Sequence, residues 1–130
     1  MRRYCLLGFW LVGILFPLGW LGSFSTSYRQ AFNAAFGAET THVVMHFILY
    51  MSLVVIGFWS FNAQLTHHSL IISLALILCI GMVQELFQAL SSGNYLPWAI
   101  MYDLVIDLTG GAMGLILIAA WKHTRKLMAR

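Results

Sequence analysis

The chain has 130 residues, of which 61% are hydrophobic and 8% charged, with a formal net charge of +3. Soluble domains usually carry about 25% charged residues, so this composition excludes a water-covered surface. Six of the seven Lys and Arg residues lie near the two ends and form no patch, which argues against nucleic-acid binding. Lipid solvates apolar side chains, and a helix satisfies its own backbone hydrogen bonds. We therefore expect an integral membrane protein.

The first expected span covers residues 4–22, an apolar run behind the basic pair Arg2 and Arg3. The run is long for a signal-peptide core and lacks an Ala-x-Ala cleavage pattern, which favours a retained helix. Pro17 is expected to kink this helix or to end it early. In the polar interval 23–41, apolar residues recur at helical spacing, which predicts a short amphipathic helix at the membrane surface.

Three further spans are expected over residues 42–61, 69–90 and 99–121. Each is close to the roughly 20 residues that cross a hydrocarbon core about 30 Å thick. Basic residues at both ends place both termini in the cytoplasm by the positive-inside rule, which requires an even number of spans. The expected fold is a single all-α domain, residues 1–130, forming a four-transmembrane-helix bundle. The tryptophans are expected to anchor at membrane interfaces: Trp10, Trp20, Trp59, Trp98 and Trp121.

Polar side chains inside the later spans mark the expected site. An ionisable group in a bilayer costs about 2.5–3.5 kcal/mol on insertion scales, so it is by default a functional candidate. At about 1.5 Å per helical residue, these groups lie within about 15 Å of the outer interface in the expected topology. They are His42, His46, Gln84, Glu85, Gln88, Asp103 and Asp107. One polar site that opens outward is the economical interpretation.

Helical spacing places these residues on defined faces. His42, His46 and Tyr50 step by four and share one stripe. The last span carries a stripe of acids and glycines, which consists of Asp103, Asp107, Gly110, Gly111 and Gly114. Small residues let helix backbones approach closely in membranes. The glycines are therefore expected to pack against another helix and to turn the two acids towards the bundle interior.

The histidine pair has two interpretations. Histidines at i and i+4, such as His42 and His46, can hold a metal ion, but most such pairs do not. The plainer expectation is that His42 is exposed at the outer interface. His46 would then form a structural hydrogen bond to a carboxylate.

The acidic residues also have a plainer interpretation. Glu85 can carry a proton and pair with Gln88. Asp103 and Asp107 are adjacent like charges, which favours one proton shared between them. A purely structural polar cluster therefore stays open as an alternative.

The order and spacing of these residues resemble the VanZ-like family of membrane proteins. His46-x3-Tyr50 lies on one helix, Glu85-x2-Gln88 ends another, and Asp-x3-Asp-x2-Gly-x3-Gly begins at Asp103 on the last. The resemblance extends over about three of the four expected spans. It implies a four-helix protein of the bacterial cytoplasmic (inner) membrane. The founding member of the family is associated with low-level resistance to the glycopeptide teicoplanin, and most relatives have no assigned activity. We expect this chain to act in the cell envelope.

The chain departs from the family pattern at three places. His42-Val43 stands where the family usually has Asp-Lys, and residues 89–98 lack the usual Arg. Asp107 replaces the family's Asn. These departures remove positive charge and add negative charge, so the site is more acidic here than in the family.

The leading hypothesis is a VanZ-like protein whose outward-facing polar pocket binds a lipid-linked or cell-wall-related ligand, or a cation, because the polar residues share one depth and face inward. His46, Glu85 and Gln88 would make the primary contacts, and Asp103 and Asp107 would lie opposite. Membrane lipids, partner membrane subunits or further copies of the chain are the expected partners, and the sequence identifies no cofactor.

A second hypothesis is an accessory transmembrane subunit of a larger complex. The polar residues would then be structural, or His46 would ligate a pigment or haem. Catalysis by His46 and Glu85 as base and acid is the weakest option, because no nucleophile motif or metal-ligand set accompanies them.

Overall fold

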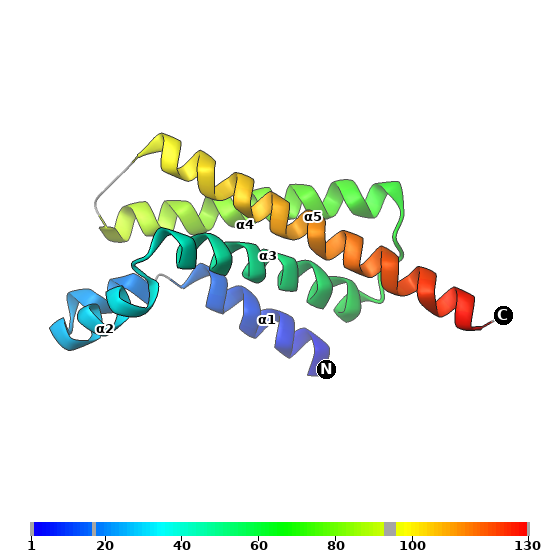
Figure 1. Cartoon of the computed structure of the whole chain (residues 1–130), viewed down its shortest axis with the longest axis horizontal. Helices are drawn as coiled ribbons and strands as arrows, with labels where there is room; N and C mark the ends of the chain where they lie inside the picture. The colour runs from blue at the N-terminus through cyan, green and yellow to red at the C-terminus, as the bar shows by residue number, and fades with distance from the viewer. Residues whose placement is uncertain (1, 17, 93–95, 130) are drawn as a thin grey trace.

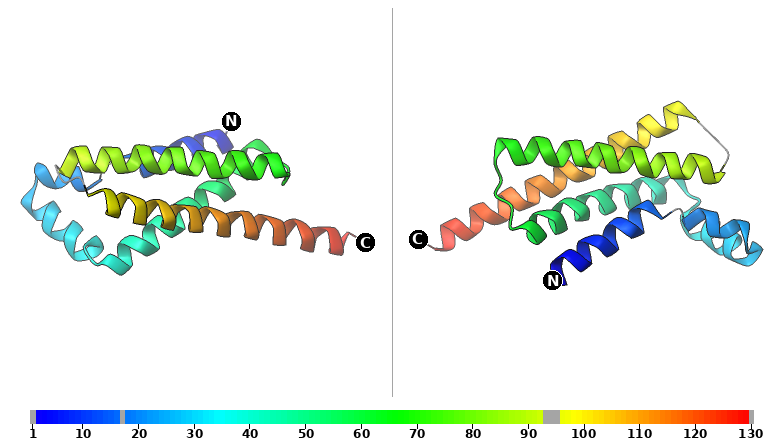
Figure 2. Two further views of the ribbon diagram at one scale, coloured as in Figure 1. Left: turned by 90° about the horizontal axis from the view of Figure 1, so that it is seen from above. Right: turned by 180° about the vertical axis from the view of Figure 1, so that it is seen from behind.

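The computed structural model describes residues 2–16, 18–92 and 96–129, without the side chains of residues 18–20 and 92. Within these residues the chain forms helices and no strand, which confirms the expected all-α class. The elements are α1 (Arg2–Leu15), the 3-10 helix η1 (Leu18–Ser23), α2 (Thr26–Phe36), α3 (Glu39–Phe61), α4 (His67–Ser92) and α5 (Pro97–Met128). Helix α3 packs against α5 and α1, and α4 packs against α5 and α1, with α5 crossing α3 and α4 (Figures 1 and 2).

Within the described residues, three helices are long and apolar enough to cross a membrane: α3, α4 and α5. They contain the predicted spans 42–61, 69–90 and 99–121 and extend each one. Pro97 lies in the first turn of α5, where its missing N–H would have no helical partner in any case. The extension of α5 ends with Arg125 and Lys126, whose charges complement the negative end of the helix dipole.

The first predicted span is not one continuous helix. Helix α1 has only 14 residues and ends at Leu15, so it is shorter than the roughly 20 residues of a full crossing. It ends before Pro17, which lies outside the described residues. Proline disfavours helical geometry in the residue before it and cannot donate a helical hydrogen bond, so an early end was expected. The 3-10 helix η1 follows.

The predicted short helix before the second span is present as α2. Its N-terminus is capped by Ser25, whose hydroxyl accepts a hydrogen bond from the backbone N–H of Tyr28 at 3.2 Å. Tyr28, Phe32 and Phe36 form an aromatic row, with neighbouring ring centroids 5.9 and 5.1 Å apart. No residue of α2 is buried. The helix lies at the end of the bundle opposite both chain termini (Figure 1).

Trp10 does not serve as an interface anchor. It is partly buried against the hydrophobic core, and its indole N–H donates a hydrogen bond to the Leu49 carbonyl at 3.1 Å. Trp10 therefore fastens α1 to α3, while the side chain of Trp20 lies outside the described part. The remaining tryptophans are exposed near helix ends: Trp59, Trp98 and Trp121.

Helices α3 and α5 run in the same direction and pack closely through glycines (Figure 1). A Cβ atom at Gly110 would collide with the backbone of Phe47. A Cβ at Gly114 would lie 2.7 Å from the Met51 carbonyl oxygen. The third glycine of the stripe, Gly111, faces Ile77 of α4 instead. Because Gly110 and Gly114 have no side chains, the α3 backbone can occupy the space beside them.

We expect Gly110→Ala to lower the free energy of unfolding by about 1–3 kcal/mol, the usual range for overpacking a tight contact. The cause is that the new methyl group meets backbone, which moves less readily than a side-chain end. Gly57→Ala on α3 is the matched control, because a Cβ there meets nothing within 4 Å. Unfolding in detergent micelles measures both. Equal stability of the two variants would contradict the close approach of α3 and α5.

Candidate functional site

Two histidine–aspartate pairs join α3 to α5. His42 Nε2 lies 3.0 Å from Asp103 Oδ1, and His46 Nδ1 lies 2.8 Å from Asp107 Oδ1. Each pair joins residues 61 positions apart. Because the two helices run in the same direction, a step of four residues along each preserves the pairing. The imidazoles of α3 and the carboxylates of α5 therefore form a ladder of two rungs.

The two rungs differ in depth. The side chains of His46 and Asp107 are 4% and 0% exposed, whereas those of His42 and Asp103 are 39% and 11% exposed. The rings of His42 and His46 are neighbours, with centroids 4.4 Å apart. The polar cluster that these two pairs form is therefore shielded from solvent at His46 and Asp107, and His42 is its most exposed member.

Helix α4 closes the third side of the cluster. The fully buried Tyr50 donates its hydroxyl hydrogen to Gln84 Oε1 at 2.7 Å, which links α3 to α4. A Cβ at Gly81 would lie 2.8 Å from Asp107 Oδ2 and 3.5 Å from the Tyr50 hydroxyl. Gly81 therefore makes room for the Asp107 carboxylate beneath α4.

Two carboxylate oxygens in the cluster lack a hydrogen-bond partner. Among the described residues, Glu85 Oε1 and Asp107 Oδ2 are buried side-chain atoms without one. Glu85 is 6% exposed and lies near both histidines and both aspartates. An unsatisfied buried polar group costs about 1–3 kcal/mol, and more when it is charged. Such groups in a native structure call for an explanation, and a bound ion is one.

Three side chains of the cluster are spaced as metal ligands. One nitrogen or oxygen atom from each of His42, His46 and Asp103 lies within 4.8 Å of the others. Donor atoms around a tetrahedral zinc ion at about 2.1 Å are about 3.4 Å apart. The three atoms are separated by distances of that order, and His42 Nε2 and Asp103 Oδ1 are 3.0 Å apart. With Nδ1 of His46 held by Asp107, the Nε2 atom of His46 is left to bind a metal. A carboxylate that holds a ligand histidine in this way is common at metal sites.

The cluster contains five of the six residues predicted to bind a ligand, namely His46, Tyr50, Glu85, Asp103 and Asp107. Gln84, which was not among the six, supplies the amide oxygen that accepts the hydrogen bond from Tyr50. The sequence signal for Gln84 is its position one helical turn before Gln88, three residues after Gly81.

Asp103 and Asp107 each bond to their own histidine, and the proton expected to be shared between them stays a prediction. His46 does bond to a carboxylate, as its plainer interpretation predicted. His42 is partly exposed and also bonds to Asp103, a contact that had been expected only of His46.

The chain matches no protein-family model, no curated protein and no solved structure. The VanZ-like resemblance therefore depends on the residue order and spacing alone.

We call His46–Asp107 the deep pair and His42–Asp103 the shallow pair. Removing one member of the deep pair should destabilise the fold much more than removing one member of the shallow pair. We expect His46→Ala to cost about 3–5 kcal/mol, because it leaves the Asp107 carboxylate buried without its partner. His42→Ala should cost about 1 kcal/mol or less, because that pair is partly exposed.

Unfolding free energies of the two variants in micelles measure the difference. Replacing both members of the deep pair, His46→Leu with Asp107→Leu, should recover much of the loss, since no unpaired charge then remains. Equal costs for His46→Ala and His42→Ala would contradict the difference in depth.

Proposed function

We propose that this protein is a multi-pass membrane protein of the cell envelope that binds a divalent transition-metal cation in the cluster between α3, α4 and α5. The observation that carries the proposal is the set of donor atoms gathered there. Three carboxyl groups and two histidines meet, and two buried carboxyl oxygens lack partners among the described residues. All Lys and Arg residues except Arg29 lie near the chain ends. A bound cation would give those oxygens a partner.

The donor atoms favour a transition metal over Mg²⁺ or Ca²⁺. Imidazole suits zinc, copper, iron and nickel, whereas magnesium and calcium prefer oxygen ligands alone. His42, His46 and Asp103 would be the protein ligands, and Asp107 would orient His46. Glu85 would supply a further oxygen, which its unpartnered Oε1 atom leaves available.

The proposal includes four membrane crossings, with α1 and η1 together as the first. At about 1.5 and 2.0 Å per residue, the two elements measure about 33 Å, close to the core thickness of about 30 Å. Both chain termini lie at the same end of the bundle (Figure 1), as an even number of crossings requires. The basic residues of that end favour the cytoplasmic side of a bacterial inner membrane. The metal site would then lie in the outer half, with α2 at the outer interface.

The VanZ-like assignment is part of the same proposal. It is supported by the order of the motifs and by the meeting of their polar residues in one cluster. The acidic character of this cluster favours a cation over the anionic headgroup of a lipid-linked ligand. Asp107, where the family has Asn, and the lack of Arg in residues 89–98 are the sequence features behind that preference.

The alternative is an accessory subunit of a larger complex, with His46 as ligand to a pigment or haem. His46 is only 3% exposed and bonds to Asp107, so a group outside the bundle does not reach it. The geometry therefore favours a small ion over a pigment.

Equilibrium dialysis against Zn²⁺, with elemental analysis of chelator-treated protein carrying no histidine tag, tests the proposal. We expect one ion per chain. His42→Ala should weaken binding by tenfold or more, since it removes a ligand that contributes about 1.4 kcal/mol or more. Because this variant is expected to keep its stability, the loss would not reflect unfolding. Absorption of the Co²⁺-substituted protein reports the coordination geometry.

His67→Ala with His68→Ala is the matched control, because both histidines are exposed at the opposite end of the bundle. It should bind Zn²⁺ as the wild type does. Equal losses in His42→Ala and in this control would reject the cluster as the site. Absence of saturable binding, together with co-purification of partner chains, would favour the accessory-subunit alternative.

A further inference from the structure

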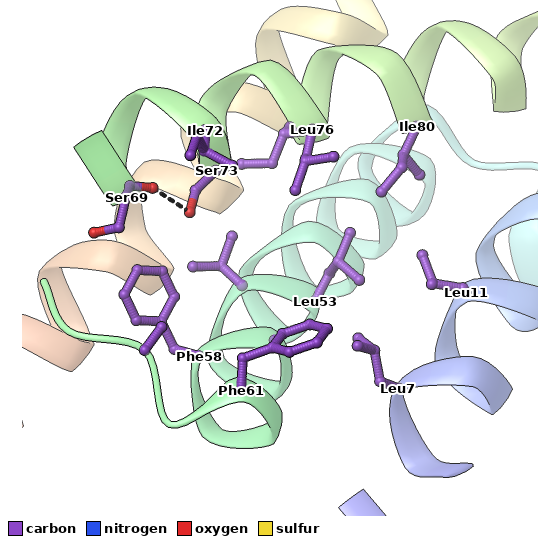
Figure 3. A pocket seen from close by; sticks show the side chains of 14 residues that line it. Leu7, Leu11, Leu53, Phe58, Phe61, Ser69, Ile72, Ser73, Leu76 and Ile80 are labelled. Atoms are coloured by element: carbon purple, nitrogen blue, oxygen red, sulfur yellow. Dashed lines mark hydrogen bonds between the residues drawn. The ribbon is translucent and has the colours of Figure 1, made fainter. Parts of the chain in front are cut away.

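An apolar groove of about 360 Å³ lies between α1, α3 and α4, and none of the metal-site residues lines it (Figure 3). Its walls include Leu7 and Leu11 of α1, Leu53 and Phe61 of α3, and Leu76 of α4. The groove exists because α3 and α4 both pack chiefly against α5 and not against each other.

Gly57 of α3 widens this groove. It lines the space, and a Cβ built there meets nothing within 4 Å. Protein interiors are packed nearly as densely as organic crystals. An apolar space of this size beside α3 and α4, which can both cross a membrane, is therefore a place for hydrocarbon.

The length of the groove fits one leaflet of a bilayer. Its wall on α4 runs from Ser69 to Ile80, about 16 Å at 1.5 Å per residue. That is close to half of a hydrocarbon core about 30 Å thick. A transmembrane helix of a partner protein is about 10 Å wide and spans the whole core, so it matches neither the length nor the volume. One lipid acyl chain matches both.

Two cations stand at the end of the groove nearest the chain termini. Lys122 Nζ donates a hydrogen bond to the carbonyl of the lining residue Ala63 at 2.8 Å. Arg3 Nη1 donates to Asn62 Oδ1 at 2.8 Å, beside the groove. Both partners are uncharged, and the described ion pairs all lie in the histidine–aspartate cluster. The positive charge at this end is therefore not neutralised by a carboxylate.

We propose that this groove binds one acyl chain of an anionic membrane phospholipid, whose phosphate lies between Arg3 and Lys122. The lipid belongs to the leaflet at the basic end of the bundle. Basic residues at a membrane surface attract anionic headgroups, and the groove supplies the apolar contact that holds one chain. This inference uses residues other than the metal ligands, so it does not depend on the proposed function.

Native mass spectrometry of the delipidated protein tests it, with phosphatidylglycerol and phosphatidylcholine of identical acyl chains as the probes. We expect one phosphatidylglycerol per chain. It should bind roughly 5- to 30-fold more tightly than phosphatidylcholine, as one or two basic residues near a headgroup provide. Arg3→Gln and Lys122→Gln should each weaken phosphatidylglycerol binding about fivefold. Arg125→Gln is the charge-matched control, because the Arg125 guanidinium lies over the ring of Trp121, which does not line the groove.

Gly57→Leu tests the groove itself, because its side chain projects into the space without meeting backbone. This variant should lose phosphatidylglycerol binding, while Gly8→Leu on α1 should retain it. Gly8 is exposed, does not line the groove, and likewise leaves open space for a Cβ. Unfolding curves of the two variants show whether both fold, and the charge variants report on the site independently.

Equal phosphatidylglycerol binding by Gly57→Leu and Gly8→Leu would overturn the groove as the site. Equal binding of the two lipids by the wild type would overturn the anionic headgroup. A change from dimer to monomer in Gly57→Leu, with lipid binding unchanged, would overturn the proposal and assign the groove to a second copy of the chain.

Discussion

The close approach of α3 and α5 controls the geometry of the polar cluster. Gly110 and Gly114 carry no side chain at the contact, so the α3 backbone lies against α5. At that separation, short aspartate side chains reach the imidazoles of the facing helix. The parallel direction of the two helices repeats the pairing after one turn. Larger residues in place of these glycines would separate α3 from α5 and so lengthen both histidine–aspartate contacts.

Polar and apolar features occupy different halves of the bundle. The half near α2 holds the buried carboxylates and histidines, whose burial in a low-dielectric interior is costly unless they are paired. The half near the chain termini holds the apolar groove and the basic residues. Helix α5 contacts both α3 and α4 along this axis and holds them in place. Helix α4 packs chiefly on α5. This position of α4 closes the third side of the polar cluster, and it also leaves the groove open between α3 and α4.

Much of this could be predicted because the bilayer imposes simple rules on sequence. Long apolar runs predicted α3, α4 and α5, although each helix extends beyond its predicted limits. The four-residue spacing of His42 and His46, and of Asp103 and Asp107, predicted two stripes that could face each other. The structure pairs each histidine with one aspartate, which the spacing alone did not specify. Trp10 could not be told from an interface anchor, because burial of its ring depends on how α1 docks on α3.

By itself, the sequence determined the helical class, the polar stripes and the separation of acids from cations along the chain. These properties follow from local periodicity and from the cost of placing charges in lipid. Only the tertiary structure decided that Gln84 bonds to Tyr50, that Gly81 makes room for Asp107, that two carboxylate oxygens lack described partners, and that a groove lies between α1, α3 and α4. Those features depend on how helices distant in sequence are rotated and spaced against one another. Hydrophobic periodicity does not encode that rotation, because faces of a helix that meet lipid and faces that meet other helices are both largely apolar.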